Sequence, residues 1–250
     1  MPVSSECDRS RLLLQTMYNV RDLGGLTTKD GRITKCGRFL RADAPTQLNL
    51  NDLQLLLDFP VRTVIDLRSQ NEIVELPHGL RDLPEVDYIN IPLLGDDLGA
   101  GIAAVQMYEA GRDMVGLADL YIHMLENSRE SLGQVFVQMA AARSGACLFH
   151  CAHGKDRTGL ISALLHLLAG VSDADIVANY QVSEMYLKPL YDTFMHTIPA
   201  EVRHYFNTHP QNMELTLRYF HQHFESAEAY LATCGVSSAE IAELKDRLLN

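Results

Sequence analysis

Apolar and polar positions divide the chain into short β-prone runs and longer segments with helical spacing. Three runs are short and rich in β-branched or aromatic residues, which predicts strands: VRTVIDLR (Val61–Arg68), VDYINIPL (Val86–Leu93) and ACLFH (Ala146–His150). The Asp-Gly pair in KDGR (Lys29–Arg32) predicts a tight hairpin turn ahead of them.

Apolar residues recur every three or four positions in the other segments, which predicts helices. A short helix is expected in LNLNDLQLLLDF after an Asn cap, with leucines along one side. Longer helical patterns cover Gly99–Ala142, Thr158–Ala169 and the C-terminal third. Helix stops and starts in that third are predicted at Gly170, Ser172, Gly235 and the Ser237–Glu240 capping box.

Strands that alternate with helices are typical of a mainly parallel sheet flanked by helices on both faces. The expected fold class is therefore α/β, in a single domain over residues 11–250 that follows a flexible N-terminus of residues 1–10. Ligands in such sheets bind beyond the carboxyl ends of the strands. The loop after Ala146–His150 is expected to lie at that edge.

Composition narrows the classes of function. The 250 residues are 47% hydrophobic and carry a net charge of −11, so a sizeable core is available and nucleic acids or anionic membranes are disfavoured as partners. The five cysteines are scattered and do not form the pattern of a disulfide framework. No secretory signal is recognisable, and no run approaches the ~18 apolar residues of a membrane span. A cytoplasmic protein is the resulting expectation.

The stretch LFHCAHGKDRTGLISALL (Leu148–Leu165) joins a strand, a polar loop and a helix start, an arrangement that binds anions through backbone N–H groups and the helix dipole. Arg157 can hold two phosphate oxygens through its planar fork. Cys151 would be favoured as a thiolate and placed for in-line attack. Cleavage of a phosphate monoester through a cysteinyl-phosphate intermediate is therefore predicted. The expected phosphate contacts are Ala152, His153, Gly154, Lys155, Asp156, Arg157 and Thr158.

Other interpretations of this loop fit less well. A Cys147–Cys151 disulfide would have to bridge about 13 Å of strand, beyond the ~7 Å limit for such a bond. Zinc could use Cys147, His150, Cys151 and His153 as ligands. However, side-chain alternation along the strand places His150 on the opposite face from Cys147, and a zinc site would not explain the presence of Lys155 and Arg157. A nucleotide P-loop requires Gly-Lys-Ser/Thr, whereas this loop contains Gly-Lys-Asp. No metal is therefore expected.

HCAHGKDRTG (His150–Gly159) resembles the His-Cys-x5-Arg loop of cysteine-dependent protein tyrosine phosphatases. Its Gly-Lys-Asp-Arg-Thr-Gly form is similar to that of the bacterial tyrosine/serine phosphatase family, which has mycobacterial members and listerial lipid phosphatases. NVRDLGG (Asn19–Gly25, with Val20 in place of Phe), GRFLRAD (Gly37–Asp43), VIDLRSQNE (Val64–Glu72) and AYLATCGVSSAEIAEL resemble further blocks of that family. The resemblance extends from about Leu12 to Leu249.

The resemblance implies a tyrosine phosphatase-like α/β domain whose additional helices cover the active site, with residues 99–126 as the lid candidate. It implies no metal or organic cofactor. The substrates that it implies are phosphorylated proteins, on phosphotyrosine and in some members on phosphoserine or phosphothreonine, and phosphoinositides, with inorganic phosphate as the product. A catalytically dead phosphate-binding module and a rhodanese-like sulfur carrier are the alternatives.

Individual roles follow from the resemblance and from position in the loop. Thr158 is expected to donate its hydroxyl to the Cys151 sulfur, or else to be an ordinary residue of the first helical turn. His150 is expected to stiffen the loop through backbone hydrogen bonds, and His153 to contact substrate or to face solvent. Lys155, at a position where related lipid phosphatases carry a lysine, is either a second phosphate contact or a solvated lysine.

The leaving oxygen requires a general acid. The chain has no tryptophan, so the Trp-Pro-Asp loop that carries this acid in many tyrosine phosphatases is absent in its usual form. Asp156 is the preferred candidate, because its neighbours on both sides belong to the loop and the resembling family has an aspartate there. Asp96 and Asp97, after the strand at 86–93, are the alternatives.

Charged residues near the ends of the predicted strands are expected to support the site. Asp66 and Arg68 end a central strand beside the loop. A buried ion pair of Arg68 with Glu72, or of Arg21 with Asp22, is expected to hold the surrounding loops in place.

Overall fold

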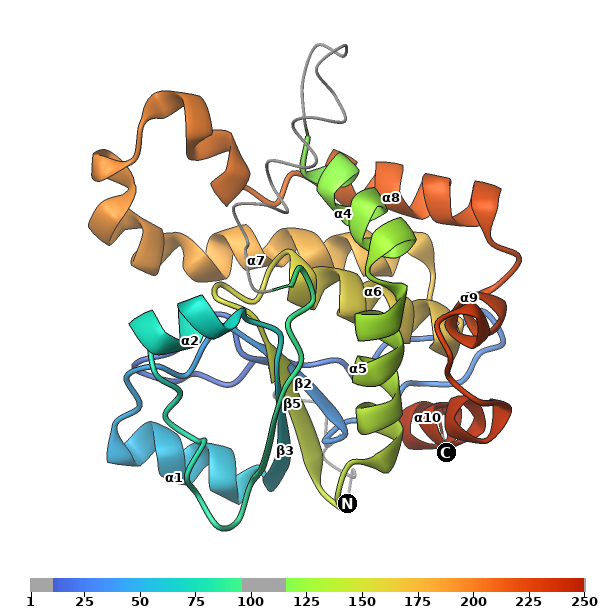
Figure 1. The fold of residues 1–250 in the computed structure, drawn as a ribbon, viewed down its shortest axis with the longest axis horizontal. Coiled ribbons are helices and arrows are strands. Elements are labelled where there is room, and N and C mark those ends of the chain that lie inside the picture. The colour runs from blue at the N-terminus through green and yellow to red at the C-terminus, as the bar shows by residue number, and fades with distance from the viewer. Residues whose placement is uncertain (1–10, 96–115, 250) are drawn as a thin grey trace, which may run out of the picture.

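The computed structural model describes residues 11–95 and 116–249, and it places a mixed sheet at the centre of the fold (Figure 1). The five strands are hydrogen-bonded in the order β1-β2-β5-β3-β4, and every pair is parallel except β1 with β2. The expected α/β class with a mainly parallel sheet is therefore confirmed. The strands are β1 (Arg21–Asp22), β2 (Phe39–Ala42), β3 (Val61–Asp66), β4 (Asp87–Asn90) and β5 (Ala146–His150).

The three strands predicted from the sequence, β3, β4 and β5, all form, and β5 has the predicted bounds. Strands β1 and β2 were not predicted, because they have only two and four residues and each contains charged side chains. All four residues of β2 are nevertheless buried, since β2 lies between β1 and β5. Sheet position, rather than local pattern, makes this segment a strand.

Helices fill most of the remaining described chain, and their predicted signals are present. Asn49 caps the first helix, and Gly170 ends α6 with a left-handed backbone. The helices are α1 (Leu50–Asp58), α2 (Gln70–Glu75), α4 (Leu117–Asn127), α5 (Arg129–Ala141), α6 (Arg157–Ala169), α7 (Asp173–Phe194), α8 (Pro210–His223), α9 (Ala227–Thr233) and α10 (Ser238–Leu249), with the 3-10 helices η1 (Met195–Thr197) and η2 (Ala200–Phe206).

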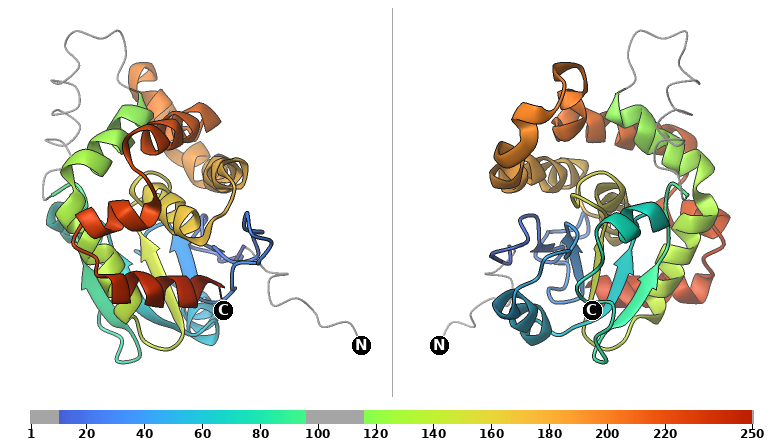
Figure 2. Two further views of the ribbon diagram at one scale, coloured as in Figure 1. Left: turned by 90° about the vertical axis from the view of Figure 1, so that its right-hand side faces the viewer. Right: turned by 60° about the vertical axis from the view of Figure 1, so that its left-hand side comes forward.

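Alternating side chains of the central strands supply two hydrophobic cores. In β5, Cys147 and Phe149 belong to the core shared with α4, α5, α6 and α10, whereas Ala146 and Leu148 belong to the core shared with α1. Figure 2 shows α1 and α5 on opposite sides of the sheet. A strand buried on both faces is what a continuous apolar run such as ACLFH indicates.

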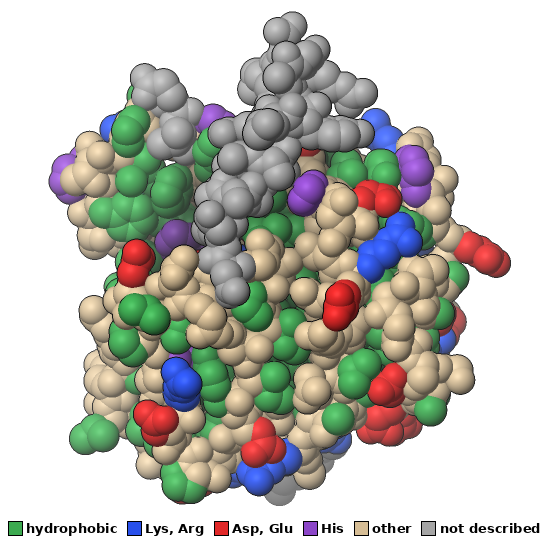
Figure 3. Space-filling model, viewed as in Figure 1, with side chains coloured by type: hydrophobic (Ala, Val, Ile, Leu, Met, Phe, Trp, Pro, Cys, Tyr) green, Lys and Arg blue, Asp and Glu red, His purple; other side chains and the backbone are tan. Residues whose placement is uncertain are grey.

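The C-terminal part of α7 leads into η1 and η2, and residues 187–206 form a projection that is called the arm below (Figure 1). Hydrophobic side chains gather on the face of the arm that Figure 3 shows. Among the described residues, no helix is long and apolar enough to cross a membrane.

Two expectations concern residues outside the described ranges. These are the flexible N-terminus, residues 1–10, and most of the lid candidate at 99–126, of which the described part is residue 116 and α4 up to Glu126. Among the described cysteines, Cys147, Cys151 and Cys234 are free thiols.

Candidate active site

The sheet places the segment from Cys151 to Arg157, called the 151–157 loop below, at its carboxyl edge. His150, the last residue of β5, is paired with Ala42 of β2 and Asp66 of β3. The chain then leaves the sheet and enters α6 at Arg157. The loop therefore begins between two parallel neighbours, at the edge where the sequence predicted it.

Four consecutive carbonyl groups of the 151–157 loop are held by donors outside the loop, at 2.7 to 3.0 Å. The C=O and N–H of one peptide unit point in opposite directions. When the carbonyls point out of the loop, the N–H groups therefore point into its interior. The donors, in loop order, are His150 Nδ1 for Cys151, the Ala44 amide for Ala152, Asn19 Nδ2 for His153, and Asn19 Nδ2 with Arg41 Nη2 for Gly154.

The backbone amides of the loop are left for a ligand. Within residues 11–95 and 116–249, none of the amides from Ala152 to Asp156 donates a hydrogen bond to the protein. Gly154 has a φ of 68°, and a Cβ at this position would collide with the Ala42 carbonyl, so the turn requires glycine. A ring of free amides at a helix N-terminus is an anion-binding site.

Arg157 is fixed at one edge of its guanidinium. Its Nη1 and Nη2 donate to the two carboxylate oxygens of Glu72 at 2.7 and 2.8 Å, and Nη1 also lies 3.3 Å from the Leu67 carbonyl. Burial alone would lower the pKa of Arg157, but the hydrogen bonds and charge of Glu72 raise it above its usual value. The guanidinium has five N–H donors, so the Nε–Nη2 edge can still bind two phosphate oxygens.

The expected pairing of Arg68 with Glu72 is wrong. Arg68 instead forms a buried ion pair with Asp66 at 2.8 Å, within the same β3 terminus, and Glu72 is free to hold Arg157. Asp66 ends β3 and Glu72 lies in α2, and sequence spacing alone cannot show which guanidinium group each carboxylate faces after folding.

The expected pairing of Arg21 with Asp22 is also wrong, because adjacent residues of a strand point to opposite faces. Arg21 donates to the Asn179 carbonyl and the Ser183 hydroxyl of α7, at 2.7 and 2.8 Å. Asp22 accepts from the amides of Gly24 and Gly37. Arg21 therefore connects the N-terminal segment to α7, and Asp22 connects the turn after β1 to the segment just before β2.

Three buried residues behind the loop were not identified as functional from the sequence. Asn19 and Arg41 hold the loop carbonyls, and Asp43 accepts the amides of Tyr18 and Asn19 at 2.9 Å. Burial raises the pKa of Asp43 to about 6, and it lowers the pKa of Arg41 to about 10. The signal in the sequence is their position in NVRDLGG and GRFLRAD, two blocks that resemble those of the phosphatase family.

Lys155 is buried rather than solvated, so that alternative is wrong. Its ammonium donates to Asp156 Oδ1 and to the Tyr205 carbonyl of the arm, each at 2.7 Å. The same Asp156 oxygen accepts the Tyr121 hydroxyl at 2.6 Å, and the Tyr180 hydroxyl lies 2.8 Å from that of Tyr121. One oxygen of Asp156 is thus fixed by two donors.

His153 packs into the arm, so the expectation that it faces solvent is wrong. Its ring lies 5.4 Å from Tyr191, 6.5 Å from Phe194 and 5.9 Å from Phe206, measured between centroids. Burial lowers the pKa of His153 to about 4. A cavity of about 440 Å³ lies between the loop and the arm, with Ala152, His153 and Phe194 among its lining residues.

Thr158 does not make its expected contact. Its hydroxyl is buried and has no hydrogen-bond partner among the described residues, the Cys151 sulfur included.

The contact of His150 with the backbone is present, because its Nδ1 lies 2.9 Å from the Cys151 carbonyl. Asp96 and Asp97, the alternative acids, lie outside the described residues.

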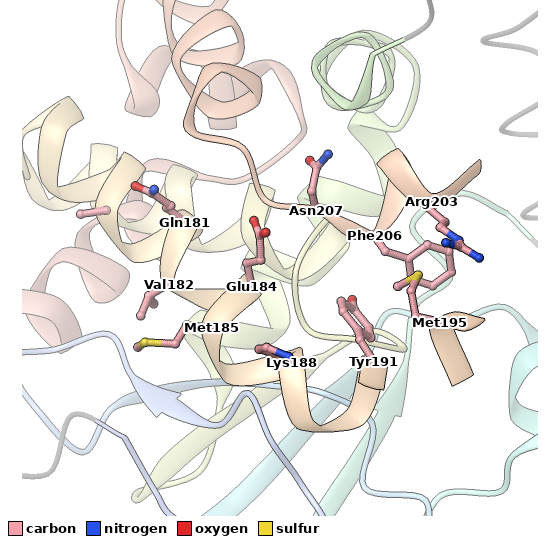
Figure 4. Close-up of a pocket in the computed structure, with 11 residues that line it drawn as sticks. Gln181, Val182, Glu184, Met185, Lys188, Tyr191, Met195, Arg203, Phe206 and Asn207 are labelled. Atoms are coloured by element: carbon pink, nitrogen blue, oxygen red, sulfur yellow. The ribbon is translucent and has the colours of Figure 1, made fainter. Parts of the chain in front are cut away.

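A second and larger cavity lies where the arm meets the preceding part of α7. It has a volume of about 900 Å³ and is lined by α7 on one side and by η1 and η2 on the other (Figure 4). In Figure 4 the side chains of Met195, Arg203 and Phe206 lie across from Tyr191 of α7. Tyr191 and Phe206 line this cavity and also contact His153, so the cavity adjoins the 151–157 loop.

Among the described residues, one group of side chains has the spacing of metal ligands. Atoms of Asp66, His78 and His150 lie within 4.8 Å of one another, and all three residues are buried. The guanidinium of Arg68 donates to Asp66 at 2.8 Å and already provides the positive charge that balances the carboxylate. A cation here would face that guanidinium, so the residues do not fit a metal ion.

Sequence comparison finds relatives of this chain that are named tyrosine-protein phosphatases. A tyrosine-protein phosphatase of Nostoc commune is 35% identical over 222 residues, covering 84% of this chain and 74% of that protein. A protein of Cupriavidus necator, provisionally named a tyrosine-protein phosphatase, is 30% identical over 175 residues, covering 69% of this chain and 62% of that protein.

Among solved structures, TpbA of P. aeruginosa in complex with pTyr is 21% identical to this chain, with a TM-score of 0.34. The match covers 58% of this chain and 67% of that one. The sequence pattern of the tyrosine phosphatase family matches residues 12–250. Because that pattern covers nearly the whole chain, the protein belongs to the tyrosine phosphatase family.

Proposed function

We propose that this phosphatase hydrolyses phosphotyrosine through a cysteinyl-phosphate intermediate on Cys151. The observation that supports this most is the arrangement of the 151–157 loop: four carbonyls are held from outside, and the amides from Ala152 to Asp156 have no protein acceptor within the described ranges. These amides and the Nε–Nη2 edge of Arg157 would bind the phosphoryl oxygens. Cys151 lies at the start of the same loop.

In the first step the Cys151 thiolate attacks phosphorus, an S–P bond forms, and the bond from phosphorus to the tyrosine oxygen breaks. The leaving oxygen takes a proton from a carboxylic acid. In the second step a water molecule attacks phosphorus, its proton returns to the carboxylate, and the thiolate leaves. The amides and Arg157 stabilise the charge on the equatorial oxygens in both steps.

Asp156 is the proposed acid. Its Oδ1 accepts from Tyr121 and Lys155, so the proton for transfer would be carried on Oδ2. After transfer, the same two donors stabilise the carboxylate that remains. The arrangement therefore supplies both a fixed side chain and a stable product of proton transfer.

Phosphoserine, phosphothreonine and phosphoinositides remain predictions from the resemblance. The lysine expected to favour polyanionic lipids is buried and donates to Asp156 and to the arm, so its geometry does not favour contact with a second phosphate. Substrate range is tested by comparing turnover of phosphotyrosine, phosphoserine and phosphothreonine peptides with that of phosphoinositide vesicles. Lys155→Ala that lowers lipid turnover more than peptide turnover would restore the lysine to a role in specificity.

The covalent mechanism is tested with Cys151→Ser, in which a hydroxyl that stays protonated replaces the thiolate. Turnover of p-nitrophenyl phosphate should vanish while inorganic phosphate still raises the melting temperature of the variant. Rapid acid quenching of the wild type with a ³²P-labelled phosphotyrosine peptide should leave label on Cys151. Retained turnover in Cys151→Ser, or a quenched protein without label on that residue, contradicts the mechanism. Thiosulfate sulfurtransferase activity would support the sulfur carrier instead.

A further inference from the structure

A pair of buried histidines lies behind the 151–157 loop, and only one of them belongs to the loop motif. His150 ends β5, whereas His78 lies in the segment between α2 and β4. Their Nε2 atoms are 2.9 Å apart, and His78 is 7% exposed and His150 fully buried. Two buried ring nitrogens at this distance must share one proton, so the position of that proton can be worked out from their other contacts.

The contacts at both ends fix the direction of the pair. The Leu80 amide donates to His78 Nδ1 at 3.0 Å, so His78 Nδ1 is an acceptor and a neutral His78 has its proton on Nε2. At the other end His150 Nδ1 lies 2.9 Å from the Cys151 carbonyl, which can only accept, so Nδ1 of His150 has the proton. His78 Nε2–H therefore donates to His150 Nε2, and the chain of donors runs from Leu80 to Cys151.

Both histidines must be neutral for this chain to exist, and the surroundings favour that state. Burial lowers the pKa of His78 to about 2, and burial also lowers the pKa of His150. The charged groups that act on the pair are Asp66, which raises the two pKa values, and Arg68, Arg81 and Arg157, of which Arg68 lowers both.

Asp66 is negatively charged and close to His150, but it does not form a hydrogen bond with His150 Nε2. Its oxygens accept from the amide and guanidinium of Arg68 and from the Tyr88 hydroxyl, at 2.8 to 3.2 Å. The distance from Asp66 Oδ2 to His150 Nε2 is 3.7 Å, which is too long for a hydrogen bond. The lone pair of His150 Nε2 is therefore available to His78.

We propose that His78 is a positioning residue of the active site, because its Nε2–H keeps His150 in the Nδ1–H form that holds the Cys151 carbonyl outside the loop. Without that donor, His150 Nε2 would be a buried acceptor beside Asp66 and would take up a proton of its own. If the proton moves from Nδ1 to Nε2, His150 stays neutral but can no longer donate from Nδ1. If Nε2 takes up an additional proton, His150 becomes a positive charge behind Cys151. The first carbonyl of the loop would lose its fixed orientation in one case, and the charge around Cys151 would change in the other. This role rests on the proposed function of Cys151.

The first test determines the tautomers of His78 and His150 by NMR. In wild-type protein labelled with ¹⁵N-histidine, NMR should show His150 in the neutral Nδ1–H form and His78 in the neutral Nε2–H form between pH 6 and 8, which spans the ordinary pKa of histidine at about 6.5. The opposite tautomers, or a protonated His150 in the wild type, overturn the proposal. This result does not depend on substrate turnover, so it stands apart from the test of Cys151→Ser.

The second test compares three substitutions. In His78→Gln the new side-chain amide nitrogen can take the place of Nε2, whereas in His78→Asn it matches only Nδ1, and His78→Leu has no donor at all. His78→Gln should retain kcat on p-nitrophenyl phosphate within about threefold, and His78→Asn and His78→Leu should lose about tenfold to a hundredfold. In the last two variants the His150 spectrum should change to the other tautomer or to the protonated form.

The matched control is His166→Leu, which removes another buried histidine, one that contacts the Leu23 carbonyl from within α6. It should lower the melting temperature but leave kcat and the His150 spectrum unchanged. Equal losses of kcat in the Gln and Asn variants, or an unchanged His150 spectrum in a folded His78→Leu, overturn the proposal. If His78→Leu does not fold, the Gln and Asn variants and the wild-type spectrum still decide it.

Discussion

The 151–157 loop is held in different ways at its back and at its front. At the back, Asn19, Arg41 and His150 donate directional hydrogen bonds to loop carbonyls, and all three residues are buried. At the front, the arm contacts His153 through the rings of Tyr191 and Phe206, and its one hydrogen bond to the described loop side chains comes from Lys155 to the Tyr205 carbonyl. Lost hydrogen bonds leave buried polar groups unpaired, whereas aromatic contacts can rearrange. The contacts at the back should therefore determine kcat, because they orient the loop. The contacts at the front should determine KM, because they affect how substrate binds to the loop.

The largest effect is expected for Asn19→Leu, which keeps the branched shape of the side chain but removes the amide that helps to hold the His153 and Gly154 carbonyls. The His153 carbonyl would be left unpaired at a cost of about 1–3 kcal/mol, and the Gly154 carbonyl would keep only its Arg41 donor. Misplaced amides should lower kcat by about a hundredfold or more. Thermal unfolding and p-nitrophenyl phosphate kinetics measure both. Asn19→Asp is the control of similar shape, and it should also fail because it has no donor. A kcat near that of the wild type in either variant would show that the back does not set the chemistry.

Asp156→Asn extends the comparison to the loop itself, because Asp156 accepts from Tyr121 and from Lys155, which also donates to the arm. Activity on an aryl phosphate with a poor leaving group should fall by about a hundredfold or more, since general acid catalysis contributes about 10²–10⁴-fold. Activity on p-nitrophenyl phosphate should fall much less, because its leaving group needs little protonation. Equal losses on both substrates would assign Asp156 a structural role and make Asp96 the next acid to test.

The pH dependence of stability tests the electrostatics of the back. Asp43 has a folded pKa of about 6, above its unfolded value of about 3.9, so folding is penalised when this group ionises. The free energy of unfolding of the wild type, relative to Asp43→Asn, should fall by about 2–3 kcal/mol as pH rises from 4 to 7. Urea unfolding at both pH values measures this difference. A constant or rising difference would mean that Asp43 is not held as a buried carboxyl of raised pKa.

A smaller effect is expected at the front. Phe206→Ala removes a ring that contacts His153, Tyr191 and Phe194, and it should raise KM for a phosphotyrosine peptide by about threefold to tenfold with kcat nearly unchanged. The control is Tyr191→Phe, which removes only a buried hydroxyl that has no partner among the described residues. It should leave both constants unchanged and stability unchanged or slightly higher. A fall in kcat with constant KM in Phe206→Ala would place the arm in the chemical step.

The sequence by itself determined the parts whose physics is local. Beta-branched runs gave β3, β4 and β5, caps gave the helix ends, and the loop composition indicated an anion site at the end of β5. The spacing of Cys151 and Arg157 identified the family that comparison confirms. These features depend on residues within a few positions of one another, so they can be recognised without knowledge of the fold.

Only the tertiary structure decided which distant groups meet. Glu72 holds Arg157 across 85 positions, Asn19 reaches Gly154 across 135, and His78 reaches His150 across 72. Glu72 and Arg68 are close along the chain, which favours a pair between them, but in the fold Arg68 pairs with Asp66 and Glu72 with Arg157. Buried polar groups must find a partner somewhere, but many partners are chemically equivalent. Which one is reached depends on strand order and on the paths of the connecting segments, and no local pattern encodes either.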